Sequence, residues 1–235
     1  MAARMNRLLS RARGVVSSGV CLIAGHSIAG YRRGRWLLLG VLTLLLAYGA
    51  HWTKAHRYQF IERNFRAVVP DQVYAGAFQY RLPLERIVEK YHIKTVLSLM
   101  PEGFRAEAME QQVLAAKGVK FERIPISTSK SQCGTSNTVE EFLSARMPLV
   151  EEAAEFLADP NNQPVFVHCQ AGKHRTGAVV AVFRLQHCGW TEWAARKELK
   201  TWGGLDRHAW WPSLALHDFS AKHSPDTAPI SASAE

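Results

Sequence analysis

The stretch "VFVHCQAGKHRTGAVVAVFRLQ", residues 165–186, constrains the fold more than any other part of the chain. Val165–Val167 is short, apolar and mostly β-branched, which predicts a buried strand of a parallel or mixed sheet. Residues Thr176–Gln186 place small or apolar side chains at helical spacing, which predicts a helix packed on that sheet. The loop Cys169–Arg175 therefore joins the end of a strand directly to the start of a helix.

A loop at this position is predicted to bind an anion next to a reactive cysteine. Backbone N–H groups and the positive end of the helix dipole converge there, and Gly172 lets the backbone approach a phosphate closely. Arg175 lies six residues after Cys169, where its guanidinium can bind two phosphate oxygens in a bidentate manner. The same positive field lowers a cysteine pKa from about 8.5 to roughly 3.5 to 7.5. Cys169 is therefore predicted to be a thiolate nucleophile.

The motif from His168-Cys169 to Arg175-Thr176-Gly177 resembles the signature of the cysteine-dependent protein tyrosine and dual-specificity phosphatases. The wider stretch "NQPVFVHCQAGKHRTG" is similar to atypical dual-specificity phosphatases of plants, fungi and bacteria, some of which act on inositol pyrophosphates. The upstream stretch "NFRAVVPDQVYAGAFQ" is similar to the entry hairpin of bacterial members, including periplasmic ones. The resemblance implies an α/β, three-layer dual-specificity phosphatase-like fold with a central mixed sheet flanked by helices.

The resemblance also implies a role for each residue of the motif. Cys169 attacks phosphorus and forms a phosphocysteine, and Arg175 binds the phosphoryl oxygens, while the loop amides stabilise the transition-state charge. Thr176 hydrogen-bonds the sulfur and makes it a better leaving group, and His168 supports the loop without transferring a proton. The residues expected to contact the substrate are Gln170, Ala171, Gly172, Lys173 and His174. No metal or cofactor is implied.

One departure from the family pattern concerns the general acid. Relatives carry an aspartate on the loop that here reads "STSKSQCGTSNTVEEF", and this loop contains no aspartate. Thr138 and Glu141 form the Thr-x-x-Glu capping box of a helix. Glu141 is therefore expected to be a helix cap rather than the general acid. The remaining candidates for the general acid are Glu140 and the distant Asp206. A phosphoanhydride, whose leaving group is already a stable phosphate, suffers least from a missing acid.

The rest of the chain alternates strands and helices, which predicts a three-layer sheet with the site at the carboxyl end of a strand. Residues 58–222 are expected to form one phosphatase domain, preceded by a basic segment, 1–35, and followed by a disordered tail, 223–235. The predicted helices are 83–91, 107–117, 138–158, 191–202 and 208–219, and the predicted strands besides that before Cys169 are 94–99 and 119–126.

The charge is concentrated in the N-terminal region. The formal net charge is +9, and residues 1–57 hold nine basic residues and no acidic one. Residues 58–235 are therefore neutral overall, so the basic balance does not indicate a nucleic-acid partner.

Residues 36–52, "WLLLGVLTLLLAYGAHW", are mostly apolar and uncharged, with Trp36 and Trp52 placed like interfacial anchors. They predict a single-pass anchor in the inner (cell) membrane. More arginines precede the segment than follow it closely, so the catalytic domain is expected outside the cytoplasm, in the periplasm of a Gram-negative cell. Two alternatives remain open: cleavage at the small-x-small site Ala47-Tyr48-Gly49, or a membrane hairpin with residues 14–30.

The four cysteines show no metal-ligand spacing. Cys133 lies on the loop expected to cover the site, and one hypothesis is a reversible disulfide with Cys169 that protects the nucleophile.

Four functions compete as explanations of these features. The leading expectation is a protein tyrosine or dual-specificity phosphatase acting on phosphorylated proteins. The second is a phosphatase of small or lipid phosphates, such as phosphoinositides or inositol pyrophosphates, for which Lys173 favours highly charged substrates. The third is a non-catalytic phosphate-binding module. The fourth is a rhodanese-like or arsenate-reductase-like thiol enzyme, which would not need Thr176.

Overall fold

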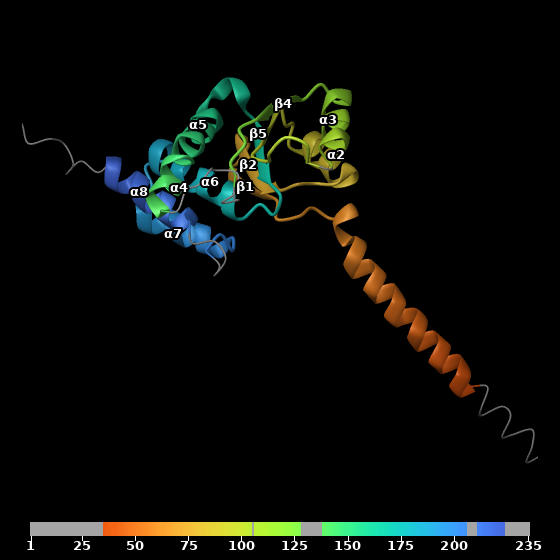
Figure 1. Cartoon of the computed structure of the whole chain (residues 1–235). Helices are drawn as coiled ribbons and strands as arrows, with labels where there is room; N and C mark the ends of the chain where they lie inside the picture. The colour runs from red at the N-terminus through yellow and green to blue at the C-terminus, as the bar shows by residue number, and fades with distance from the viewer. Residues whose placement is uncertain (1–34, 105, 128–137, 206–210, 224–235) are drawn as a thin grey trace, which may run out of the picture. The chain divides into compact units, whose positions relative to one another are not determined.

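The computed structural model describes residues 35–104, 106–127, 138–205 and 211–223 (Figure 1). The chain divides into two compact units, residues 1–57 and 58–235. The second unit is built on a five-stranded sheet in the order β1-β2-β5-β3-β4. β1 (Arg66–Val69) pairs antiparallel with β2 (Val73–Ala77) in the expected entry hairpin, whereas β2, β5 (Val165–Cys169), β3 (Thr95–Ser98) and β4 (Lys120–Arg123) are parallel. The predicted mixed sheet is confirmed.

Helices cover both faces of the sheet, which confirms the three-layer prediction. On one face lie α2 (Arg81–Lys90) and α3 (Glu107–Ala116), whose buried side chains form one core. On the other lie α5 (Met147–Ala158), α6 (His174–His187) and α8 (Trp211–His223), which share the larger core with α4 (Val139–Ser144). α7 (Glu192–Thr201) packs on α6, and the described residues also include the 3-10 turns η1 (Arg57–Gln59) and η3 (Pro160–Asn162).

The central strand β5 is buried on both faces, and its alternating side chains decide what surrounds the cysteine. Val165, Val167 and Cys169 belong to the core under α5 and α6, whereas Phe166 belongs to the core under α2 and α3. Since strand side chains alternate with period two, His168 must share the face of Phe166, and the two rings stack with centroids 5.5 Å apart. His168 and Cys169 are consecutive in the motif, yet their side chains lie on opposite faces of the sheet.

The predicted long helix 138–158 is wrong, because the structure breaks it into α4 and α5. Pro148 has no N–H to donate to the carbonyl four residues earlier, so it is favourable only in the first turn of a new helix. At the break, Arg146 is buried and stacks on the Phe142 ring at 3.4 Å. Its guanidinium donates to Phe142 O at 2.8 Å, which occupies a carbonyl near the end of α4. The break thus has both a backbone and a side-chain cause.

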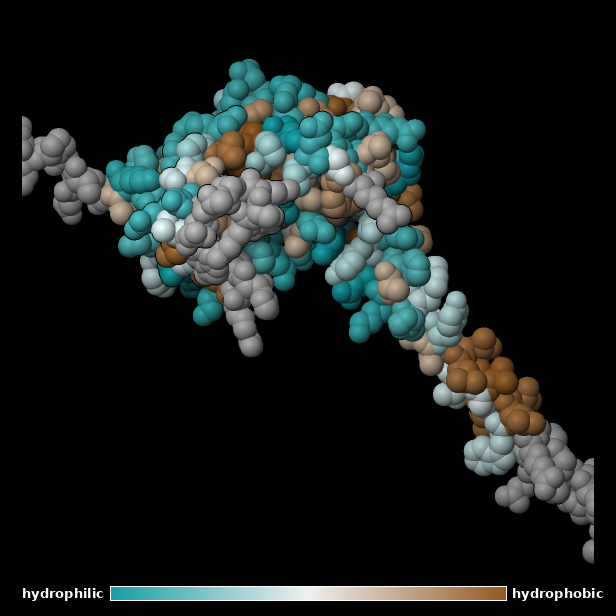
Figure 2. Space-filling model, in the orientation of Figure 1, coloured by the Kyte–Doolittle hydropathy of each residue, from teal (hydrophilic) through white to brown (hydrophobic). Residues whose placement is uncertain are grey.

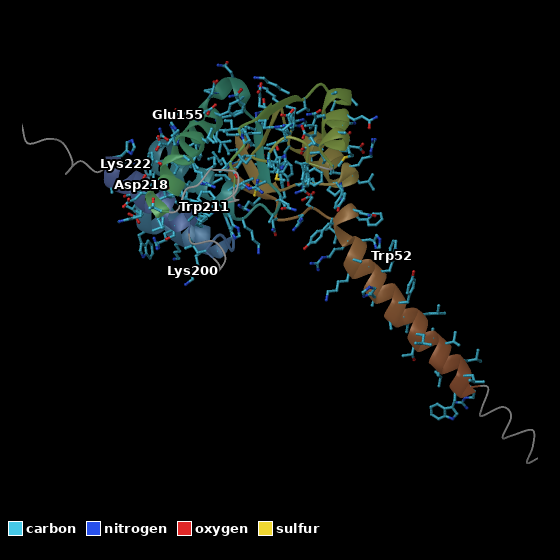
Figure 3. All side chains as sticks on the ribbon, in the orientation of Figure 1. Trp52, Glu155, Lys200, Trp211, Asp218 and Lys222 are labelled. Atoms are coloured by element: carbon cyan, nitrogen blue, oxygen red, sulfur yellow. The ribbon has the colours of Figure 1, made fainter. Side chains whose placement is uncertain are left out.

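Smaller corrections concern element ends. The strand predicted over 119–126 is only Lys120–Arg123, and α6 begins at His174, so Arg175 lies in the first turn of the helix rather than in the loop. Trp211, labelled in Figure 3, is buried at the start of α8, and its ring lies 6.4 Å from that of Phe142. The start of the predicted helix 208–219 falls outside the described residues, and α8 continues to His223.

The predicted membrane segment lies within a helix, Arg35–Gln59. Within the described part of the chain this is the one helix long and apolar enough to cross a membrane, and a signal sequence passes the same test. Figure 2 shows the apolar residues gathered along it. Trp52 projects from the same helix in Figure 3 and is exposed.

Candidate active site

The sulfur of Cys169 lies at the end of β5, where the chain enters the loop 170–173 and then α6. The side chain is only 2% exposed, and the Gly172 N–H donates to Sγ at 3.3 Å. Burial alone raises the pKa of this thiol. The charge of Arg175 lowers it, followed by the Thr176 hydroxyl and the backbone amides of Thr176 and Ala171, and the net effect is a lowered pKa. The predicted thiolate therefore has a physical basis in the structure.

Gly172 is required by the geometry of the loop. Its φ is +68°, in the left-handed region that favours glycine, and a Cβ placed on it would lie 2.3 Å from the backbone carbon of Gly76 in β2. The loop is therefore packed directly against the neighbouring strand. Because no side chain separates the two backbones, the loop amides turn tightly around the cysteine sulfur.

Arg175 is positioned by the strand on the other side of β5. It is 8% exposed in the first turn of α6, and Nη1 donates to Leu99 O, just beyond the end of β3, at 3.1 Å. This bond uses one of the five N–H donors of the guanidinium and fixes its plane. Thr176 is fully buried in the same turn; the contact of its hydroxyl with the sulfur falls short of a complete hydrogen bond among the described residues.

His168 has a buried partner that the sequence reasoning missed. Its Nε2 lies 2.9 Å from Oε1 of Glu110 in α3, with the two side chains 0% and 3% exposed. Burial lowers the pKa of His168, but the charge and hydrogen bond of Glu110, followed by Cys169, raise it above 6.5. The signal was present in the sequence: Glu110, Val113 and Leu114 share helical spacing on one buried face, so a carboxylate stands at a core position.

The remaining predicted residues are placed as follows. Gln170 is exposed, Ala171, Lys173 and His174 are half-buried, and Lys173 lies beside Gly203, where a Cβ would be 3.4 Å from its Nζ. Glu140 is exposed in the first turn of α4. Thr138 caps that helix by accepting from Glu141 N at 3.2 Å, which confirms the Thr138 part of the predicted capping box. Asp206 and Cys133 lie outside the described residues.

A mixed sheet, a cysteine at the end of its central strand and an arginine in the first turn of the following helix form the arrangement of the cysteine-dependent phosphatase superfamily. The tyrosine phosphatase family matches residues 61–209. The chain belongs to that family, and the predicted superfamily is confirmed.

Curated relatives include inositol diphosphatases. The chain is 31% identical over 121 residues to inositol diphosphatase SIW14 of Saccharomyces cerevisiae, covering 52% of this chain and 39% of that protein. It is 36% identical over 123 residues to inositol diphosphatase DSP1 of Oryza sativa subsp. japonica, covering 52% and 49%. The chain thus spans about half or less of the length of these relatives.

Solved structures support the fold. The core catalytic domain of the PP-IP phosphatase SIW14 from S. cerevisiae, in complex with citrate, superposes with a TM-score of 0.55 at 23% identity, covering 67% of this chain and 86% of that one. A variant of P. aeruginosa TpbA in complex with pTyr has a TM-score of 0.50 at 19% identity, covering 68% and 89%. The three-layer architecture is therefore that of known phosphatases.

The lowered pKa of Cys169 predicts how its alkylation depends on pH. In the full chain, the rate of modification by iodoacetamide, followed on the Cys169 peptide by mass spectrometry, should have its midpoint below that of a free cysteine, about 8.5. Arg175→Met should move the midpoint upward, because the largest charge that favours the thiolate is lost. The same variant should lower kcat/KM for an activated aryl phosphate by about 10³. A wild-type midpoint at or above that of a free cysteine would contradict the prediction.

The pair His168–Glu110 predicts a pH-dependent stability. Because the folded pKa of His168 is raised, the contribution of the pair to the free energy of unfolding is fully present below pH 6.5. This contribution is lost as the pH rises through the pKa of His168 in the folded state. Glu110→Gln should therefore lower the free energy of unfolding by about 2 kcal/mol at pH 6 and by less at higher pH, measured by urea unfolding.

Glu122→Gln is the control for this measurement. Glu122 pairs with Lys120 on the surface at 2.9 Å, so its substitution should cost less than about 0.5 kcal/mol at every pH. An effect of Glu110→Gln that grows with pH would show that the imidazolium form of His168 is not the stabilised one.

Proposed function

We propose that the chain is a phosphatase that forms a phosphocysteine on Cys169 and acts on small, highly charged phosphates, with the phosphoanhydride of an inositol pyrophosphate as the leading substrate class. The observation that carries the proposal is the buried Cys169, whose pKa is lowered chiefly by the charge of Arg175 in the first turn of α6. The names of the curated relatives support the substrate class.

In the first step the Cys169 thiolate attacks phosphorus, the sulfur–phosphorus bond forms, and the bridging phosphorus–oxygen bond breaks with its electron pair going to the departing oxygen. The loop amides and Arg175 stabilise the charge on the three equatorial oxygens. In the second step a water oxygen attacks phosphorus, the sulfur–phosphorus bond breaks and the thiolate returns, stabilised by Thr176. The water proton passes to solvent and inorganic phosphate leaves.

The sequence of residues 127–139, the loop expected to cover the site, supports an anhydride over an alkyl ester. Residues 127–139 contain neither aspartate nor glutamate. An alkoxide leaving group needs a proton as it departs, whereas a phosphate leaving group departs as a stable anion. The half-buried Lys173 in the loop and His174 at the start of α6 provide cationic or donor groups, as a polyphosphate requires.

Phosphotyrosine proteins are the second candidate substrates. A phenolate is a better leaving group than an alkoxide, so the missing acid penalises phosphotyrosine less than phosphothreonine. Membership of the tyrosine phosphatase family supports phosphotyrosine proteins as substrates.

A substrate panel tests the proposal with the full chain in detergent and Cys169→Ser as control. The panel holds an inositol pyrophosphate, phosphoinositides, phosphotyrosine and phosphothreonine peptides and an activated aryl phosphate. The pyrophosphate should be hydrolysed about 10² times faster than the phosphothreonine peptide, because only the latter needs a general acid. Cys169→Ser should release no phosphate from any of them.

The other outcomes are equally informative. Turnover of phosphotyrosine peptide in preference to the pyrophosphate would select the second candidate. Phosphate binding without any turnover would mean that the chain is a binding module. Glu140→Gln should leave the pyrophosphate rate unchanged, and a loss of rate in this variant would show that Glu140 is the general acid.

We also propose that residues 36–52 anchor the chain in the cell membrane with the catalytic unit outside the cytoplasm. The apolar helix and the excess of arginines before it support this topology. Alkaline phosphatase fused after Glu235 should be active and green fluorescent protein at the same place dark in a Gram-negative host. The reverse pattern would place the catalytic unit in the cytoplasm, and the mass of the purified N-terminus would reveal cleavage after Gly49.

A further inference from the structure

The segment Arg63–Arg66 lies against the outer side of the phosphate loop, more than one hundred residues away in sequence. Three of its side chains each donate a hydrogen bond to a different backbone carbonyl of the loop. The contacts are Arg63 Nη1 to Gln170 O at 3.3 Å, Asn64 Nδ2 to Ala171 O at 2.8 Å and Arg66 Nη2 to Gly172 O at 3.0 Å. Three consecutive carbonyls of the loop are thus held from one side.

The segment is itself held firmly. Gln79, only 1% exposed, accepts from Arg63 N at 3.0 Å and donates to Arg63 O at 2.8 Å. Asn64 adopts φ +49°, a left-handed conformation that asparagine tolerates better than most residues. The Arg66 guanidinium stacks on the Trp202 ring at 3.7 Å. These contacts fix the three donors before any ligand is bound.

Holding a carbonyl on one side of the loop fixes an amide on the other. In a trans peptide the C=O of one residue and the N–H of the next point in opposite directions across a rigid plane. The carbonyls of residues 170, 171 and 172 therefore aim the N–H groups of residues 171, 172 and 173 inward. The structure shows this at Gly172: Asn64 holds Ala171 O, and the Gly172 N–H donates to Cys169 Sγ.

We propose that Arg63, Asn64 and Arg66 form a brace that sets the direction of the loop amides, which makes them positioning residues for phosphoryl transfer. The inference rests on the proposed phosphatase function of the same loop. Pre-aimed amides need no reorganisation when charge develops on the equatorial oxygens, so the brace should act more strongly on the transition state than on bound substrate.

Arg66 also contributes charge. Burial lowers its pKa to about 10, while Glu198 and the neighbouring Cys169 act in the opposite direction. The guanidinium is therefore still protonated at neutral pH, and its positive charge lies behind the loop that holds the thiolate. Arg66 therefore has two roles. It donates a hydrogen bond to Gly172 O, and its charge adds to the positive field at the thiolate.

The test compares Asn64→Ala and Arg66→Met with matched controls in the full chain purified in detergent. Asn161→Ala removes an asparagine side chain that donates to Asp159 Oδ1 at 2.9 Å, at the opposite end of β5. Arg184→Met removes a buried arginine that stacks on Trp190 at 4.2 Å and donates to Val68 O at 2.7 Å. Each control loses a side-chain hydrogen bond without touching the loop, and Arg184→Met also loses an ion pair with Glu198 at 2.9 Å.

With an activated aryl phosphate, Asn64→Ala should lower kcat about tenfold and change KM by less than about threefold, as expected for a group that only orients the catalytic donors. The affinity for orthovanadate, which takes a five-coordinate geometry on the cysteine sulfur, should fall more than that for inorganic phosphate. Asn64→Asp should be worse than Asn64→Ala, because a carboxylate repels Ala171 O, and Arg66→Lys should recover part of the loss in Arg66→Met.

Two results would overturn the brace. One is a rise in KM at unchanged kcat, which would show ground-state binding only. The other is a loss in Asn64→Ala and Arg66→Met no larger than in their controls at equal thermal stability. If the wild type hydrolyses nothing, the proposed function fails, yet the comparison of vanadate and phosphate affinities still decides whether the brace acts. An active wild type with unaffected brace variants refutes the brace alone.

Discussion

The architecture around β5 is organised by one electrostatic requirement, that a cysteine thiolate must be stable almost out of contact with water. Burial by itself favours the neutral thiol, so the protein has to supply positive charge and N–H groups at the sulfur. These come from different elements: the first turn of α6 supplies Arg175 and Thr176, and the loop supplies the amide of Gly172. Since each donor is weak at a distance, the strands beside β5 must hold the loop and Arg175 in place.

The sheet meets this demand because β5 lies between β2 and β3. β2 presents Gly76 to the loop at a distance that no side chain could occupy, and the chain beyond β3 accepts a hydrogen bond from Arg175. The alternation along β5 then sends Cys169 to one layer and His168 to the other, where Glu110 lies. The nucleophile is thus connected to both helical layers through two adjacent residues of one strand.

The part of the site that lies within residues 165–186 could be predicted from the sequence, because its chemistry depends on local geometry: a strand end, a glycine, a helix start and an arginine six residues on. The contributions of Glu110, Asn64 and Arg66 could not, since each reaches the site through tertiary contacts across long stretches of chain. The layered fold followed from the order of elements. The hydrophobic pattern does not predict the break between α4 and α5, because its spacing continues across the break. Pro148 does indicate a break at this place.

The positive field that stabilises the thiolate also limits how the leaving group can be protonated. A carboxylic acid close to Arg175 would be ionised by the same charge that ionises Cys169, so a general acid must lie on a covering loop, away from the guanidinium. Residues 127–139 carry no carboxyl group, and Glu140 is exposed in the first turn of α4. Under the proposed function, a site with no acid on this loop would still form the sulfur–phosphorus bond but would give little help to an alkoxide. The leaving groups best suited to such a site would be those that depart as stable anions, and a phosphate released from an anhydride is such a group.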